Sequence, residues 1–345
     1  MHTLTYCEAI REAHVQLLES DPDVFVLGQG LWSPWYVGAT LRDLDKEFGH
    51  DRILDSPISE NATTGAAIGA ALGGMRPIIV HPRMDFMLLA TDPIVNQAAN
   101  WSYIFDGQAN VPLVIRAIVN RGGEQGAQHS QALQGLFMHI PGLKIVMPST
   151  PYDAKGLLIS AIYDGNPVLY IDDRWLYNDV GDVPDEMYRV PIGSSAIRRY
   201  GRDATVVATS FMAPRAVEAA AVLAREGIDL EVIDLRSIKP WDSDCVLSSV
   251  RKTHCLIVAD AAWKTCGVAA EIAATVSAEA FDALQARIAR VCLPDAPAPT
   301  SRPLEEAYYI GAGDIAAAVE RTVSLKEARW LSRSLSLTPE STIEV

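Results

Sequence analysis

The chain has 345 residues, of which 49% are hydrophobic and 21% charged, and its formal net charge is −14. This length and composition suit two globular domains, and the negative charge disfavours nucleic acids or anionic membranes as partners, because they need a basic face. No stretch is long and apolar enough to cross a membrane, and the five scattered cysteines predict buried, reduced thiols in a cytoplasmic protein.

Short apolar, β-branched runs alternate along the chain with longer stretches of helical periodicity. Continuous apolar strands alternating with helices predict an α/β fold with mainly parallel sheets covered on both faces. The strand-like runs are 23–28, 76–81, 111–119, 143–148, 167–172, 204–210, 230–235, 255–260 and 289–294. The helix-like stretches are 5–19, 61–73, 86–104, 151–164, 213–226, 242–251, 266–283 and 312–325.

The segment 178–193 is rich in Pro, Gly and acidic residues, so it indicates a boundary between domains. We assign 1–182 to a first α/β domain, 183–200 to a linker and 201–327 to a second α/β domain. The polar end, 328–345, is expected to be a mobile tail or an arm that docks on a partner.

Glu60 directly precedes the predicted helix 61–73, which contains no charged residue. Its position leaves two interpretations open. Ser59 could be the N-cap, with Glu60 favoured in the first turn by the helix dipole. Alternatively, Glu60 is a carboxylate in an apolar wall, able to keep a proton at neutral pH because burial disfavours the charged form.

Gly65, Gly69 and Gly73 lie on one face of the same helix, at a spacing of four residues. Each glycine costs a helix about 1 kcal/mol against alanine, so three on one face need a reason. We favour the close approach of another helix, between subunits, over tight packing inside one domain.

Other candidate residues have equally open roles. His129, in the glycine-rich loop 121–131, is either a donor or acid near neutral pH or a loop residue bonded to a backbone carbonyl. Phe86 is predicted as a core aromatic, with ring stacking as the minority interpretation. Asp260 follows an apolar run, where parallel sheets place functional groups, or it caps a turn. The chain lacks the Rossmann, P-loop, HExxH and G-x-S-x-G motifs, and also the G-D-G and Asn pattern that holds Mg²⁺ on a diphosphate.

Several stretches together resemble the β subunit of the E1 component of 2-oxoacid dehydrogenases, the family of the pyruvate, branched-chain and acetoin enzymes within the transketolase-like thiamine diphosphate superfamily. The resemblance covers the chain up to 314–323. It implies a pyrimidine-binding domain followed by a transketolase C-terminal-like domain. The stretches are DSPISE, GAAIGAALGGMRPI, GGEQGAQHSQ, PGLKIVMPSTPYDAKGLL, NPVLY and LEVIDLRSIKPWD.

This resemblance implies an enzyme that decarboxylates a 2-oxoacid and passes the acyl group to lipoyl-E2, in an α₂β₂ heterotetramer. Thiamine diphosphate would be shared with the α subunit, which would hold the Mg²⁺. Glu60 matches the glutamate that hydrogen-bonds N1′ of the cofactor's aminopyrimidine, and Ile58 belongs to the same cofactor-binding set. Phe86 matches the aromatic beside that ring, and His129 a histidine at the mouth of the site that assists acyl transfer. The glycine face of 65–73 resembles the family's helix contact between subunits.

The turn 160–167 matches a family K⁺ site that is built from carbonyl groups. The resemblance implies that its ligands come from Leu113, Ala161, Ile162, Asp164 and Asn166.

Some residues depart from the family pattern near the expected site. Gln29 stands where a glutamate linked to proton relay between two active sites is expected, which puts that coupling in doubt. Met84 replaces an aromatic residue, and His81 and Arg83 are new. These changes indicate an altered substrate pocket or another acceptor. Two alternatives therefore stay open: a carboligase or ketol transferase that moves a two-carbon unit to an aldehyde, ketone or sugar, and a non-catalytic scaffold subunit.

Overall fold

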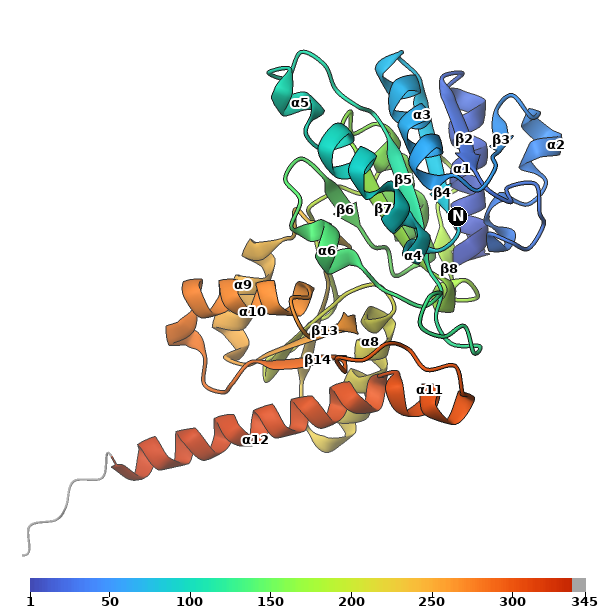
Figure 1. Ribbon diagram of the computed structural model, residues 1–345. Coiled ribbons are helices and arrows are strands. Elements are labelled where there is room, and N and C mark those ends of the chain that lie inside the picture. The colour runs from blue at the N-terminus through green and yellow to red at the C-terminus, as the bar shows by residue number, and fades with distance from the viewer. Residues whose placement is uncertain (337–345) are drawn as a thin grey trace, which may run out of the picture.

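The computed structural model describes residues 1–336, which fold around two large β-sheets (Figure 1). The first sheet has seven strands in the order β12-β6-β7-β5-β4-β2-β3, all parallel to their neighbours except β12, which is antiparallel to β6. The strands are β2 (Val24–Gly28), β3 (Ile53–Asp55), β4 (Arg76–His81), β5 (Val114–Val119), β6 (Lys144–Val146), β7 (Val168–Asp173) and β12 (Ser237–Lys239).

Helices cover both faces of this sheet, as the alternating sequence pattern predicts. On one face α1 (Tyr6–Ser20) packs against α7 (Pro151–Ile162), and on the other lies α3 (Glu60–Leu72). Thr5 begins α1 with a capping box, in which its side chain and that of Glu8 bond each other's backbone N–H groups. The shorter helices are α2 (Leu44–Phe48) and α6 (Gln134–Met138).

The prediction of one continuous helix over 86–104 is wrong. The segment is broken into α4 (Met84–Met87), a 3₁₀ turn (Leu88–Ala90), a π-helical stretch (Pro93–Ala98) and α5 (Trp101–Ile104). Pro93 has no N–H to donate to the preceding turn, so a regular α-helical ladder cannot run through it. The break leaves Phe86 near the end of a short helix at the edge of the first sheet.

The second sheet has the order β14-β13-β10-β11-β9, with β9 antiparallel to its neighbour. Its two faces have separate cores: α8 and α12 pack on one, and α9 and α10 on the other. The elements are β9 (Ala196–Arg199), β10 (Ala204–Ala208), β11 (Leu230–Asp234), β13 (Leu256–Trp263), β14 (Ala289–Leu293), α8 (Met212–Leu223), α9 (Ser243–Thr253), α10 (Val268–Glu279), α11 (Arg302–Tyr308) and α12 (Ala312–Ser336).

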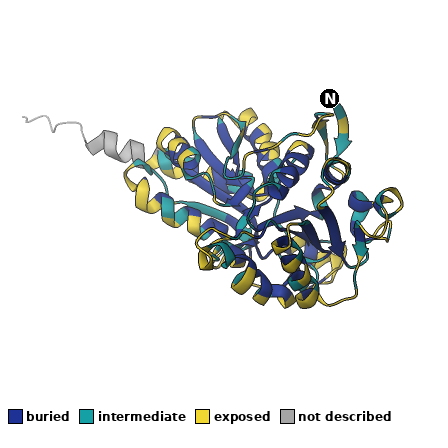
Figure 2. Cartoon of the chain, turned by 90° about the horizontal axis from the view of Figure 1, so that it is seen from above, coloured by how far each residue is buried: buried dark blue, intermediate teal, exposed yellow. Residues whose placement is uncertain are grey.

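The two halves of the chain share one core. A single cluster of buried apolar side chains runs from Ile115 and Leu169 of the first sheet to Val258 and Ile272 of the second half. The strand β12 belongs by sequence to the second half but completes the first sheet. Figure 2 shows the strands of both sheets in the dark blue of buried residues, with exposed positions on the outer helices.

The predicted α/β fold with mainly parallel sheets is confirmed.

The predicted linker, 183–200, includes all of β9 and the last residue of β8 (Val180–Val183), which pairs with β1 (His2–Thr5). At the other end, α12 continues to Ser336, so the first part of the predicted tail is helical, and 337–345 lie outside the described residues. Within 1–336 no helix could span a membrane. All five cysteines are free, and Cys266 is exposed, contrary to the expectation of burial.

Candidate functional site

A small pocket opens where β2 and β4 end, at the carboxyl edge of the first sheet. Parallel strands bring the residues that follow them to one edge, which is where open α/β sheets bind ligands. Glu60, at the start of α3, and Phe86, on α4, both face this pocket. The residues that line it are Gly28, Gln29, Ser56, Pro57, Ser59, Glu60, Thr63, Val80, His81, Pro82 and Phe86.

The Glu60 carboxylate is nearly buried, with 9% of the residue exposed, and within residues 1–336 it has neither a hydrogen bond nor an ion pair. Ser59 occupies the N-cap position of α3, but its hydroxyl makes no capping hydrogen bond. The cap interpretation is therefore wrong for the Ser59 side chain. Glu60 stands in the first turn of α3 and lines the pocket, where its carboxylate can accept a hydrogen bond.

The rings of Phe86 and His129 lie edge to face, with centroids 5.2 Å apart and an interplanar angle of 88°. Phe86 is half-buried, so the prediction of a core aromatic is wrong. Among the described residues no carbonyl accepts a hydrogen bond from the His129 ring, which argues against the structural interpretation of that histidine. The structure thus brings together Glu60, Phe86 and His129, which are far apart in sequence.

The loop that carries His129 is fastened to α4. Gln131 donates from its backbone N–H and its side-chain amide to Oδ1 of Asp85, at 3.1 and 2.9 Å. Burial raises the pKa of Asp85. Because Asp85 and Phe86 are neighbours on α4, this anchor fixes His129 beside the Phe86 ring.

His81 is a pocket residue that the family pattern did not supply. It is 2% exposed, and its Nε2 lies 3.3 Å from the Thr64 hydroxyl on α3. Burial lowers the pKa of His81 to about 4, so the ring is neutral at neutral pH. Ile58, by contrast, is 78% exposed and does not line the pocket in this chain. Its predicted contact with a cofactor remains a prediction.

The chemistry of these side chains suits one edge and one face of a flat nitrogen heterocycle, and the space that they enclose in this chain is about 10 Å³. The Glu60 carboxylate can accept a hydrogen bond from a ring N–H, and the exposed face of Phe86 can pack against a planar ring. The low polarity of the surrounding Val80, Pro82 and neutral His81 strengthens such a hydrogen bond. Among the other pocket residues, Ser56 and Pro57 stand in the DSPISE stretch together with Glu60. Gly28 and Val80 carry no motif, and only their position at the ends of strands could have indicated them.

Three of the five residues of the predicted K⁺ site make contacts within this chain. The Lys144 ammonium lies 2.6 and 2.9 Å from the two carboxylate oxygens of Asp164. The carbonyl of Ala161 accepts from the Asp164 N–H at 3.3 Å, and that of Leu113 from the Val168 N–H at 2.9 Å. Within 1–336 no cluster of His, Cys, Asp or Glu could hold a metal ion. The K⁺ site stays a prediction.

The glycine face of α3 points away from the body of this chain. A Cβ built on Gly65 or Gly69 would meet no atom within 4 Å, whereas the opposite face, with Thr64, Ala67 and Ile68, is buried. The alternative of tight packing inside one domain is therefore wrong for these two glycines. The outward face is free for another chain.

Asp260 lies inside β13, and not at its end as the sequence suggested. Its Oδ1 accepts from the Gln134 amide at 2.8 Å and from the Thr209 hydroxyl at 2.7 Å. Burial raises the pKa of Asp260. The residue joins α6 to the second sheet and does not cap a turn.

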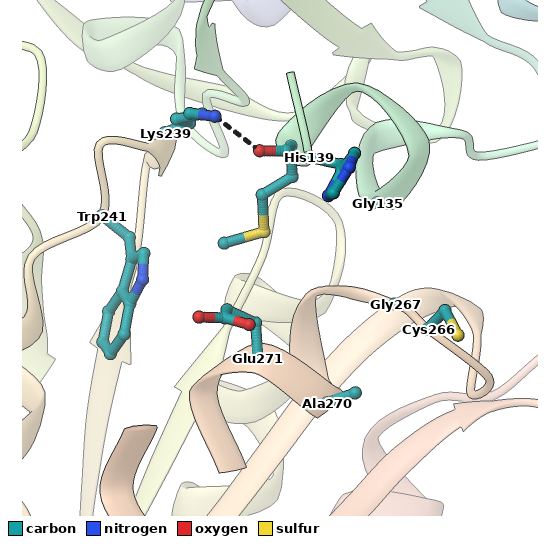
Figure 3. A pocket seen from close by; sticks show the side chains of 9 residues that line it. Gly135, His139, Lys239, Trp241, Cys266, Gly267, Ala270 and Glu271 are labelled. Carbon is teal, nitrogen blue, oxygen red and sulfur yellow. Dashed lines mark hydrogen bonds between the residues drawn. The ribbon is translucent and has the colours of Figure 1, made fainter. Parts of the chain in front are cut away.

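A larger pocket, with a volume of about 550 Å³, lies between α6 and the start of α10 (Figure 3). Its Lys239 ammonium donates to the carbonyls of Met138 and Ile140, at 2.8 and 2.7 Å. The walls contain none of the predicted site residues. We therefore place the candidate active site at the pocket of Glu60.

Comparison with known proteins agrees with this architecture. The family model described as the transketolase pyrimidine binding domain matches residues 2–179, and that of the transketolase C-terminal domain matches 193–315. The chain therefore belongs to the transketolase family of two-domain α/β proteins.

Its curated relatives are, more particularly, β subunits of dehydrogenase components. The β subunit of acetoin:2,6-dichlorophenolindophenol oxidoreductase from Cupriavidus necator is 47% identical over 326 residues, covering 91% of this chain and 96% of the relative. The pyruvate dehydrogenase E1 component subunit β from Porphyra purpurea is 40% identical over 317 residues, covering 92% and 96%. The predicted resemblance to E1 β subunits is confirmed.

A solved structure shares the whole fold. It is described as a split gene transketolase, inactive β4 tetramer, and it matches with a TM-score of 0.76 at 25% sequence identity, covering 94% of this chain and 99% of that one.

Proposed function

We propose that this chain is the β subunit of a thiamine diphosphate-dependent E1-type enzyme, which decarboxylates a 2-oxoacid and is active only with an α-type subunit. One observation carries the proposal: an unpartnered Glu60 carboxylate faces the same pocket as the Phe86 ring at the head of α3. The family of the chain and the β subunits among its relatives support it.

The residues of the pocket have separate tasks in this proposal. Glu60 would accept a hydrogen bond from the aminopyrimidine ring of the cofactor, and Phe86 would pack against that ring. When bound, thiamine diphosphate supplies an electron sink for cleavage of the bond next to a carbonyl group. His129, held beside Phe86 by the Asp85 anchor, would assist transfer of the acyl group at the mouth of the site.

The α-type subunit would hold the diphosphate and its Mg²⁺, since this sequence lacks the motif for them. The outward glycine face of α3 fits a close helix contact in an α₂β₂ heterotetramer. The inactivity of the solved relative as a β4 tetramer is in line with a β chain that needs a partner. We also propose that carbonyl groups of the turn 160–167 bind K⁺, whereas Lys144 pairs with the side-chain carboxylate of Asp164.

Lipoyl-E2 is the proposed acyl acceptor, and a carboligase or ketol transferase is the second candidate. The second candidate is motivated by His81 and Arg83, which depart from the family pattern beside the pocket, and by the transketolase among the solved relatives. The gathering of Glu60, Phe86 and His129 disfavours a non-catalytic scaffold.

The experiment is turnover by the assembled α and β chains with pyruvate or acetoin as donor and dichlorophenolindophenol as electron acceptor. We expect Glu60→Gln to lower kcat by at least 100-fold while the melting temperature and the assembly stay unchanged. Asp55→Asn, a neighbouring change of the same type, is the control. Full activity of Glu60→Gln would refute the assignment.

A further inference from the structure

The pocket of Figure 3 lies apart from the proposed active site and is built by both halves of the chain. Its walls come from α6 in the first half and from β12 and the start of α10 in the second. It shares no lining residue with the pocket of Glu60. Its volume of about 550 Å³ is that of pockets that hold small molecules, so we ask which molecule its walls suit.

One side of this pocket carries a positive charge that no acid compensates. The Lys239 ammonium donates to the carbonyls of Met138 and Ile140, which are neutral acceptors, and within residues 1–336 it forms no ion pair. Burial lowers the pKa of Lys239, as expected for an ammonium without an acidic partner. The exposed ring of His139 lies on the same side in Figure 3 and has no hydrogen-bond partner among the described residues. The third ammonium N–H and the imidazole are therefore available to a carboxylate.

The opposite wall carries a carboxylate that is equally unpaired. Glu271 stands in the first turn of α10, is exposed, and makes no hydrogen bond or ion pair within residues 1–336. Figure 3 shows it across the pocket from Lys239, and the two side chains form no ion pair with each other. Unpaired opposite charges on facing walls are complementary to a molecule that itself carries both charges.

Trp241 supplies an apolar wall beside these charged groups. It is half-buried, its ring faces the pocket in Figure 3, and its indole N–H has no hydrogen-bond partner in the described part of the chain. Met138 and Ala270 add further apolar surface to the lining. An aliphatic side chain can pack against this surface while the indole N–H remains a donor for a polar group of the ligand.

Close backbone contacts hold the two walls against each other. A Cβ on Gly135 of α6 would lie 3.2 Å from the Cys266 carbonyl oxygen and from the Gly267 Cα, so α6 touches the chain that leads into α10. A Cβ on Gly267 would lie 2.6 Å from the Trp263 carbonyl oxygen. The charged groups therefore stand on preformed walls, which lowers the cost of ordering a binding site.

We propose that this pocket binds a free aliphatic amino acid, with its carboxylate at Lys239 and His139, its ammonium group at Glu271 and its side chain against Trp241. A ligand held in this way joins the two halves of the chain and stabilises the folded protein. The inference goes beyond the proposed function and does not depend on it, because no residue of the Glu60 pocket takes part.

The test adds L-leucine to the assembled α and β chains, together with two analogues that each lack one charge. Isopentylamine has the ammonium group without the carboxylate, and 4-methylpentanoate has the carboxylate without the ammonium group. We expect leucine to bind in calorimetry and to raise the melting temperature. Each analogue should bind at least about 10-fold more weakly, because it leaves one charged group of the walls unpaired.

Substitutions assign the two ends of the ligand to the two walls. Glu271→Gln should weaken leucine binding about 10- to 100-fold and leave the affinity for 4-methylpentanoate unchanged. His139→Ala should weaken the binding of leucine and of 4-methylpentanoate, but not that of isopentylamine. Glu279→Gln is the matched control, since Glu279 is an exposed acid at the other end of the same helix and lies outside the pocket.

Cys266 reports where the ligand binds. It lines the pocket and is exposed, so its alkylation by iodoacetamide should be slowed by leucine, whereas that of Cys245, outside the pocket, should not change. Leucine that does not bind, or that binds without protecting Cys266, would overturn the proposal. So would an analogue that binds as tightly as leucine, or equal losses of leucine affinity in Glu271→Gln and Glu279→Gln.

Discussion

The outward glycines of α3 allow a test in which one substitution has opposite effects on the free chain and on the assembly. Gly65 and Gly69 belong to the middle turns of α3, and a Cβ on either would meet no atom within 4 Å. Replacing both by alanine should therefore raise the free energy of unfolding of the isolated β chain by about 2 kcal/mol, from about 1 kcal/mol per residue. Urea unfolding followed by circular dichroism measures this gain.

The same two methyl groups should weaken binding of the partner subunit. If another helix approaches the glycine face closely, extra methyl groups overfill the contact and cost about 1–3 kcal/mol, or about 5- to 150-fold in affinity. Sedimentation of α and β chains over a dilution series measures the affinity. Gly313→Ala, at an exposed position in the first turn of α12, is the control for the helix effect. Unchanged assembly of the double variant would refute the intersubunit contact.

Three further predictions concern single side chains. Because burial holds the pKa of His81 near 4, the unfolded chain binds more protons below pH 6.5, and stability falls as the pH drops toward 4. His81→Gln should therefore lose about 2 kcal/mol less than the wild type between pH 7.5 and 5 in urea unfolding; equal losses would contradict this assignment. Phe86→Ala should weaken thiamine diphosphate binding to the holoenzyme about tenfold by calorimetry, unlike Phe105→Ala. Asp172→Asn should cost about 3–5 kcal/mol in urea unfolding, since it leaves the fully buried Arg116 without its carboxylate partner, and a loss below 1 kcal/mol would argue against that ion pair.

Much of the fold could be predicted because its strands are apolar, short and separated by helical periodicity. The strands β4 and β11 lie within a residue of their predicted ranges. The strand β12 could not be predicted, because its three residues have no pattern of their own and it forms by pairing with β6, far away in sequence. The break at Pro93 shows the same limit, since apolar periodicity alone extended a helix through a residue that cannot continue it.

Candidate site residues could be predicted from the sequence where they lie within a recognisable motif. Glu60 and His129 lie in stretches that resemble a family, and the structure places Phe86 beside both: it lines the pocket of Glu60 and its ring contacts that of His129. The contact between His81 and Thr64 had no such signal, because it forms only when α3 packs against β4. Local propensity also misassigned Ser59, whose hydroxyl makes no cap.

The central claim is that this chain supplies Glu60 and Phe86 to thiamine diphosphate bound between two subunits. Calorimetric titration of thiamine diphosphate with Mg²⁺ into the assembled α and β chains tests it most directly, with the β chain alone as the reference. We predict saturable binding, one cofactor per α–β pair, in the assembly and none to the β chain alone. Absence of binding to a correctly assembled complex would contradict the claim and leave a non-catalytic scaffold subunit.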